Sequence, residues 1–95
     1  MKTSTRTAIV TGGASGIGKA IVARLARDGI AVAVADKDEK QAAEVASNIQ
    51  NGPQIISVGV DVSDRNSVEN MIEFSHESLG SLDILICNAG IMDRA

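Results

Sequence analysis

Aromatic, cysteine and histidine side chains are almost absent from this sequence of 95 residues. It contains no Tyr, no Trp, and one residue each of Phe, Cys and His. Cys87 therefore has no partner for an internal disulfide, and with His76 as the one histidine it cannot supply the ligands of a metal cluster. The composition excludes a disulfide-stabilised scaffold, predicts no bound metal, and leaves no tyrosine hydroxyl to act as an acid or base.

Positive charge and long apolar runs are also scarce. Nine Lys and Arg residues against twelve Asp and Glu residues give a net charge of −3, whereas nucleic acids and anionic membrane surfaces attract clustered positive charge. The longest uncharged apolar run, residues 30–35, is far shorter than the roughly 20 residues of a membrane-spanning helix, and no secretory signal is visible. We expect a cytoplasmic protein that binds neither nucleic acid nor membranes.

Apolar residues follow two periodicities that alternate along the chain. Short continuous runs, typical of strands covered on both faces, occupy residues 7–10, 31–35, 55–60 and 84–87. Between them, apolar residues recur at helical spacing within residues 17–25, 42–49 and 68–79. Gly29 and Gly80 follow as helix stop signals. This order predicts an α/β fold, a single domain with a parallel sheet of about four strands and helices on both faces.

A glycine-rich turn follows the first predicted strand. Gly12, Gly16 and Gly18 are spaced G-x-x-x-G-x-G where a helix begins. Glycine allows a tight turn and a close approach of backbone N–H groups to a phosphate, toward which the start of the helix also directs its unpaired N–H groups. An ordinary glycine-rich turn is the alternative, but the strand before it and the helix after it favour a phosphate site.

An acidic residue ends the second predicted strand. Asp36 lies eighteen residues after Gly18, where a carboxylate can accept hydrogen bonds from both hydroxyls of an adenosine ribose and repel a 2′-phosphate. Asp36 with Glu39 also resembles a capping box for the second helix, and both roles are compatible. Lys37 softens discrimination against the phosphate. The sequence therefore favours NAD over NADP.

Polar residues also follow the third and fourth predicted strands. Asp61, next to Val62, could offer a carboxylate to an adenine amino group, but a turn or helix-cap role is the interpretation that elementary chemistry favours. Asn88 ends the fourth strand, which is expected beside the first. Cys87 is predicted to be a small buried apolar residue rather than a catalytic thiol, and His76 to lie on the solvated surface.

Together these motifs resemble the cofactor-binding half of a short-chain dehydrogenase/reductase. The resemblance rests on Thr-Gly-Gly-Ala-Ser-Gly-Ile-Gly at residues 11–18, on Asp36, on Asp-Val at residues 61–62 and on Cys-Asn-Ala-Gly at residues 87–90. The family usually has Asn where Cys87 stands, which we interpret as a difference in packing. The resemblance implies a Rossmann-like domain over residues 1–95, truncated relative to the full family fold.

The resemblance also implies which residues contact a dinucleotide. The glycine loop would line the pyrophosphate, Asp36 with its neighbour Lys37 the adenosine ribose, and residues 61–62 the adenine. Residues 88–90 would border the ribose on the nicotinamide side and steady the sheet. The expected cofactor-binding residues are Gly12, Ser15, Gly16, Ile17, Gly18, Asp36, Lys37, Asp61, Val62, Asn88, Ala89 and Gly90.

By the same resemblance the protein is an oxidoreductase that transfers hydride between nicotinamide and an alcohol or ketone, such as an acetoin-type hydroxyketone or a 3-oxoacyl substrate. The family's catalytic Tyr-x-x-x-Lys pair would follow the residues seen here, and the sequence has no Tyr. We therefore assign no catalytic residue and expect these 95 residues alone to be inactive. The alternative is a non-catalytic nucleotide-binding or dimerisation module. A sheet that stops at residues 84–87 leaves an apolar edge, which predicts a homo-oligomer.

Overall fold

The computed structural model of the chain describes residues 6–49 and 53–88. Strands and helices alternate through these ranges without exception. In chain order they are β1 (Thr7–Thr11), α1 (Gly16–Arg27), β2 (Ala31–Asp36), α2 (Glu39–Asn48), β3 (Ile55–Gly59), α3 (Arg65–Leu79) and β4 (Ile84–Cys87). The predicted order of elements is confirmed, and the strand ends lie within one residue of the predicted ends.

The described strands form one parallel sheet in the order β3-β2-β1-β4. β1 pairs with β2 on one side and with β4 on the other, so that Ile9 lies between Ala33 and Leu85. Because all strands run in the same direction, their carboxyl ends meet at one edge of the sheet. The chain crosses to the far side of β1 between β3 and β4, and ligands of open α/β sheets bind at such a crossover point.

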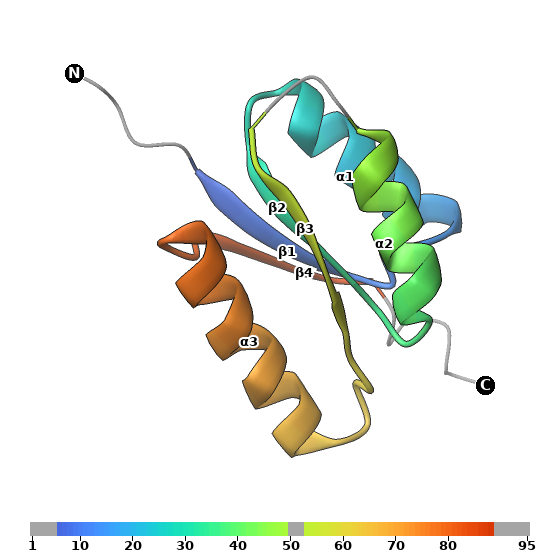
Figure 1. Cartoon of the computed structure of the whole chain (residues 1–95), viewed down its shortest axis with the longest axis vertical. Helices are drawn as coiled ribbons and strands as arrows, with labels where there is room; N and C mark the ends of the chain where they lie inside the picture. The colour runs from blue at the N-terminus through green and yellow to red at the C-terminus, as the bar shows by residue number, and fades with distance from the viewer. Residues whose placement is uncertain (1–5, 50–52, 89–95) are drawn as a thin grey trace.

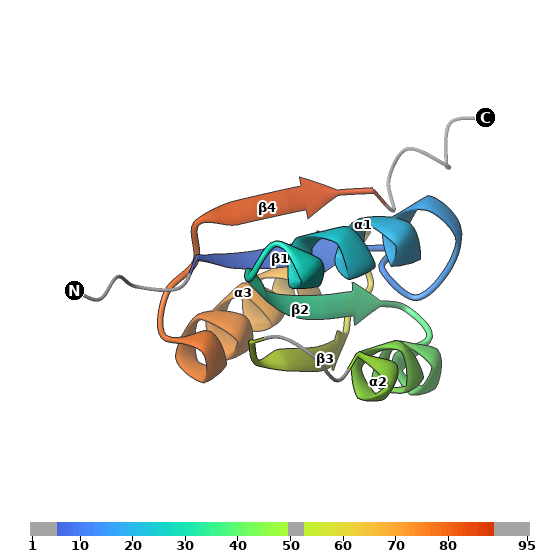
Figure 2. The ribbon, with the colours of Figure 1, turned by 90° about the horizontal axis from the view of Figure 1, so that it is seen from above.

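Helices cover both faces of the sheet, as predicted. α1 and α2 pack on one face and α3 packs on the other (Figure 1). β3 and β4 form the two edges (Figure 2). The α1/α2 face buries Ala8, Val10, Ala14, Val22, Ile30, Val32, Val34, Ala42 and Val45. The α3 face buries Ile9, Ala33, Ala35, Val60 and Met71. Neighbouring residues of β1 and β2 thus point to opposite cores, as the period of two in a strand requires.

Helix ends follow local chemistry. Gly29, just beyond α1, and Gly80, just beyond α3, have φ angles of 85° and 87°, in the left-handed region that glycine adopts at low cost. The Asp38 carboxylate caps α2 by accepting the Gln41 N–H at 3.1 Å. Asp64 occupies the N-cap position of α3, where its side chain accepts a backbone N–H of the first turn.

The predicted capping box of Asp36 and Glu39 is wrong. Glu39 is the first residue of α2, so the N-cap position falls on Asp38. Asp36 is the last residue of β2 and accepts the Asp38 N–H at 3.0 Å. The turn between the strand and the helix is therefore two residues long, which places the Asp36 side chain at the sheet edge rather than over the helix start.

The prediction that Cys87 is buried is also wrong, because Cys87 is exposed. Ile84 and Ile86 of β4 are half-buried and pack toward the α1/α2 core, whereas Leu85 and Cys87 point to the opposite face. Leu85 is 47% exposed. Of the described helices only α3 covers that face, and it leaves the β4 edge open.

A polar contact joins the amino ends of β1 and β4. Thr7 donates its backbone N–H to the Asp83 carboxylate at 3.0 Å, and the Asp83 N–H lies 3.2 Å from the Thr7 carbonyl oxygen. Thr7 is buried, so these bonds satisfy groups that water does not reach. Within the described ranges, no helix is both long enough and apolar enough to span a membrane.

Candidate functional site

The loop from β1 to α1 turns sharply at the carboxyl edge of the sheet. Gly12 and Gly16 have φ angles of 69° and 56°, which an L side chain rarely adopts. Ser15 is the N-cap residue of α1, yet its side chain makes no capping hydrogen bond to the described helix. Because the first N–H groups of a helix have no partner within it, the start of α1 keeps donors available at this edge.

Gly18 allows the loop to pass close to the first turn of α1. A Cβ atom at this position would collide with the Gly12 carbonyl oxygen and would lie 2.9 Å from Nδ2 of Asn88. The Asn88 amide itself donates to the Gly12 oxygen at 3.3 Å. The close neighbours of Gly18 are thus the carbonyl group of the loop and the residue that follows β4.

The same loop is tied to the end of β2. The Gly13 N–H donates to the Ala35 carbonyl oxygen at 3.1 Å, and the Ala14 N–H donates to Oδ2 of Asp36 at 3.1 Å. Oδ1 of Asp36 accepts the Asp38 N–H. Asp36 is half-buried, and its carboxylate therefore stands between the loop and the β2–α2 turn.

Asp61 organises the turn between β3 and α3. Its Oδ1 accepts the Ser63 hydroxyl at 2.6 Å and the Ser63 N–H at 3.0 Å. These two bonds, the hydroxyl first, hold the pKa of Asp61 below its ordinary value of 3.8, and the positive charge of Lys37 acts in the same direction. The turn role predicted for Asp61 is confirmed. Its backbone N–H donates to the Ser67 hydroxyl at 2.9 Å.

A cavity of about 270 Å³ lies where these strand ends meet. Its lining joins the carboxyl ends of β1, β2 and β3: Gly12, Asp36, Lys37, Val60, Asp61, Val62 and Ser63. Five of these are residues expected to contact a dinucleotide. Val60 and Ser63 were not among them, although an Asp with a Ser two positions later is a turn signal that could have indicated Ser63.

The other expected site residues do not line this cavity within the described part of the chain. Ser15, Gly16 and Ile17 are exposed at the start of α1, and Ile17 is 73% exposed although it fits the apolar helical pattern. Asn88 reaches the loop through Gly12. Ala89 and Gly90 lie outside the described residues. His76 is exposed, as predicted.

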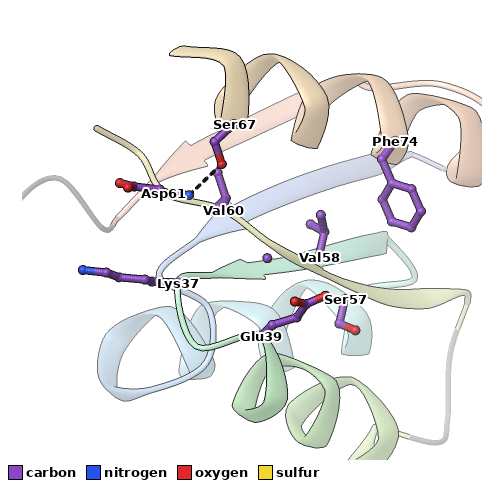
Figure 3. A pocket seen from close by; sticks show the side chains of 9 residues that line it. Lys37, Glu39, Ser57, Val58, Val60, Asp61, Ser67 and Phe74 are labelled. Atoms are coloured by element: carbon purple, nitrogen blue, oxygen red, sulfur yellow. Dashed lines mark hydrogen bonds between the residues drawn. The ribbon is translucent and has the colours of Figure 1, made fainter. Parts of the chain in front are cut away.

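A second cavity, of about 500 Å³, lies outside the β3 edge between α2 and α3 (Figure 3). Lys37, Val60 and Asp61 line both cavities. Glu39 and the half-exposed Phe74 bound the second one on opposite sides of β3. Lys37 and Asp61 are the two expected cofactor residues that it contains. No cluster of three or more potential metal ligands occurs among the described residues.

The family model described as short chain dehydrogenase matches residues 6–95. Two characterised relatives are similar over nearly the whole chain. A 3beta-hydroxysteroid dehydrogenase of Eggerthella lenta is 43% identical over 94% of this chain and 35% of its own length. An L-2,3-butanediol dehydrogenase of Corynebacterium glutamicum is 45% identical over 90% of this chain and 34% of its own length. The chain thus spans about a third of the length of these relatives.

Solved structures match in the same way. A hydroxysteroid dehydrogenase from Escherichia coli has a TM-score of 0.82 with 32% identity, over 86% of this chain and 35% of that one. A 3-ketoacyl-(acyl-carrier-protein) reductase from Brucella melitensis, complexed with NADH, has a TM-score of 0.79 with 32% identity, over 84% of this chain and 32% of that one. The glycine loop, the parallel sheet and the family match agree: the chain belongs to the short-chain dehydrogenase/reductase family.

Proposed function

We propose that these residues form the NAD-binding portion of a short-chain dehydrogenase/reductase. The observation that carries the proposal is the cavity in which Gly12 of the loop, the Asp36 carboxylate and the Asp61–Val62 turn come together. The residues present fit a dinucleotide. The carboxyl edge of the sheet offers unpaired N–H groups at the start of α1, the glycine loop between β1 and α1, and the Asp36 carboxylate at the end of β2. The relative complexed with NADH supports the class of cofactor.

The start of α1 is the proposed pyrophosphate site. The N–H groups of residues 15–18 and the positive end of the helix dipole favour a bound anion. The Ser15 hydroxyl makes no capping bond within the described helix, so it can donate to a phosphate oxygen. At Gly16, an added Cβ would meet no atom within 4 Å, so this glycine is required by its left-handed backbone and leaves space above the loop.

Asp36 is the proposed ribose acceptor. Each of its oxygens accepts one backbone N–H, and a carboxylate has about four lone-pair sites, so it can still accept two hydroxyl protons. Its negative charge repels a 2′-phosphate, and the neighbouring Lys37 reduces that repulsion. We therefore propose a preference for NAD over NADP.

The β3–α3 turn is the proposed adenine site. The lowered pKa of Asp61 keeps its carboxylate ionised, so that it can accept a hydrogen bond from the adenine amino group. Val62 is 43% exposed and can pack against the base. At the opposite end Asn88, with Ala89 and Gly90, is proposed to border the ribose on the nicotinamide side.

In the whole protein, the nicotinamide ring supplies the hydride chemistry toward an alcohol or a ketone. The names of the relatives include a butanediol dehydrogenase and a ketoacyl reductase, which supports a hydroxyketone or a 3-oxoacyl compound as substrate. The role of these residues is to bind and orient the cofactor. Because the sequence contains no Tyr, we propose that the 95 residues bind the cofactor without turning over substrate.

Calorimetric titration of the 95-residue chain with NAD and with NADP tests this function. We expect saturable binding of both, with NAD tighter. Asp36→Ala should weaken NAD binding and narrow the difference between the two cofactors, whereas His76→Ala, on the exposed side of α3, should change neither. Absence of binding by a chain shown to be folded by circular dichroism would overturn the proposal, and equal affinities would overturn the preference.

The exposed β4 edge supports a second role for the 95-residue chain on its own. Leu85 and Cys87 line an apolar cavity of about 390 Å³ with Val62, Val68 and Met71. We propose that the chain pairs through this edge as a two-fold dimer, which would cover the unpaired strand. Sedimentation at micromolar concentration should give a dimer, and a folded monomer would contradict it.

A further inference from the structure

Two consecutive backbone N–H groups of the β1–α1 loop donate to β2. One has a main-chain acceptor and the other a side-chain acceptor. The Gly13 N–H binds the main-chain carbonyl of Ala35, which no side-chain substitution removes. The Ala14 N–H binds Oδ2 of Asp36 at 3.1 Å. Ala14 is 1% exposed, so in the folded chain the Asp36 carboxylate takes the place of water as the partner of this N–H, and an unpaired buried donor is costly.

The Asp36 carboxylate is itself held in one orientation. Its second oxygen accepts the Asp38 N–H at 3.0 Å, from the turn that leads into α2. A carboxylate bound from two directions cannot rotate freely, and a hydrogen bond to an ionised acceptor is stronger than one between neutral groups. The side chain thus joins two separate turns at the sheet edge, the one before α1 and the one before α2.

This fastening divides the N–H groups of the loop into two sets. Those of Gly13 and Ala14 are directed toward β2, while those of residues 15–18 lie at the start of α1 and are available to a ligand. The direction of the second set depends on how the loop is anchored. We propose that Asp36 is a positioning residue for the phosphate-binding loop, in addition to being the ribose acceptor, and this inference rests on the proposed function.

Two ligands that differ only in their ribose hydroxyls separate these roles. We would measure the binding of ADP and of 2′,3′-dideoxy-ADP to the 95-residue chain and to its Asp36→Ala variant. If Asp36 only contacts ribose hydroxyls, its removal leaves dideoxy-ADP binding unchanged, or tighter because a negative charge near the phosphates is gone. If it also positions the loop, dideoxy-ADP should bind about fivefold more weakly, the effect of one ordinary hydrogen bond. Unchanged or tighter binding would overturn the proposal.

Asp38→Ala is the matched control. It removes the same charge from the same turn, but its side chain accepts the Gln41 N–H and does not contact the loop. We expect it to leave dideoxy-ADP affinity unchanged, and an equal loss in both variants would overturn the positioning role. Asp36→Asn retains one oxygen that can accept the Ala14 N–H, so it should restore most of the dideoxy-ADP affinity lost in Asp36→Ala.

A measurement without ligand distinguishes failure of this inference from failure of the proposed function. In the Asp36→Ala variant, the Ala14 amide should exchange with deuterium faster and its proton resonance should shift, whereas the Gly13 amide should keep its bond to Ala35. Asp38→Ala should leave the proton resonances of both amides unchanged and should change their exchange rates equally. If neither nucleotide binds the parent chain, the cofactor proposal fails while the amide result still decides whether Asp36 holds the loop. An unchanged Ala14 amide would overturn the inference.

Discussion

The two faces of the sheet are covered unequally. On one face, α1 and α2 lie over the strands and bury a continuous set of small apolar side chains. On the other, α3 covers the middle of the sheet, where Ile9 and Met71 are buried, and leaves Leu85 half exposed at β4. Successive side chains of a strand alternate between the two faces, so the difference comes from the helices and not from the strands.

β4 shows both environments within four residues. Ile84 and Ile86 contact the α1/α2 core, whereas Leu85 and Cys87, which alternate with them along the strand, are exposed. The strand is as apolar on its open face as on its covered face. The comparison teaches that the sequence of β4 is suited to a sheet with cover on both sides, and that the described helices cover one side of this strand and leave the other open.

The test with the largest expected effect compares two aliphatic residues on the α3 face of the sheet. Ile9→Ala, in the buried part, should lower the free energy of unfolding by about 2–5 kcal/mol because it leaves a cavity. Leu85→Ala, in the open part, should lower it by about 0.5 kcal/mol or less, as for other surface substitutions. Urea unfolding at one protein concentration measures both, and equal losses would show that the two parts of the face are covered alike.

A second test loosens one helix on each face. Asp64→Ala removes the cap of α3 and Asp38→Ala removes the cap of α2, and each should cost about 1 kcal/mol. Because α3 covers its face without a second described helix, Asp64→Ala should speed deuterium exchange of the β1 amides more than Asp38→Ala does. Equal exchange in the two variants would contradict the unequal cover.

A third test concerns association rather than folding. Leu85→Lys places a charge on the open β4 edge and should abolish the proposed dimer, while changing the unfolding free energy of the monomer, measured at a concentration below that at which the dimer forms, by about 0.5 kcal/mol or less. Phe74→Lys adds the same charge on α3 beside the β3 edge, and it should leave the dimer intact. Sedimentation of both variants tests whether the dimer interface lies at β4. Loss of the dimer in both variants would contradict this location.

The smallest expected effect is at the turn that begins α3. Because Ser63 lowers the pKa of Asp61 in the folded chain, the ionised carboxylate stabilises the fold above the ordinary pKa, and this contribution is lost as the pH falls through the lowered value. Ser63→Ala should raise the pKa of Asp61 toward 3.8 and reduce that loss. Ser67→Ala, whose hydroxyl accepts the Asp61 N–H, should leave the pKa unchanged. A carboxyl-carbon NMR titration measures both, and equal shifts would contradict the role of Ser63.

Most of the fold could be predicted because it depends on local pattern. The helical spacing of residues 42–49 reappears as α2, in which Ala42 and Val45 are buried. The continuous run at residues 31–35 reappears as the central strand β2, buried on both faces. The positions of Gly29 and Gly80 at helix ends follow from the left-handed backbone that glycine permits.

The errors concern relations between distant segments or single positions in a turn. The exposure of Cys87 depends on which helices cover β4, and an apolar run of four residues looks the same at a covered and an open edge. The cap of α2 falls on Asp38 because the helix begins two residues later than a capping box on Asp36 requires. At the site, glycine spacing indicated the loop, but no local pattern indicates that the Ala14 N–H binds Asp36, since that contact joins two βα turns.

The Thr7–Asp83 contact at the far end of the sheet has a consequence for the order of folding. It joins residues that are 76 positions apart in the sequence. The sequence separation between paired residues of β1 and β2 is about a third of that, since Thr7 lies opposite Ala31. Closing the longer loop costs about 1 kcal/mol more in chain entropy. β3, β2 and β1 can therefore pair during synthesis before β4 has emerged. Of the described strands, β4 emerges last, and with its open edge it should also be the first of them to detach when the chain unfolds.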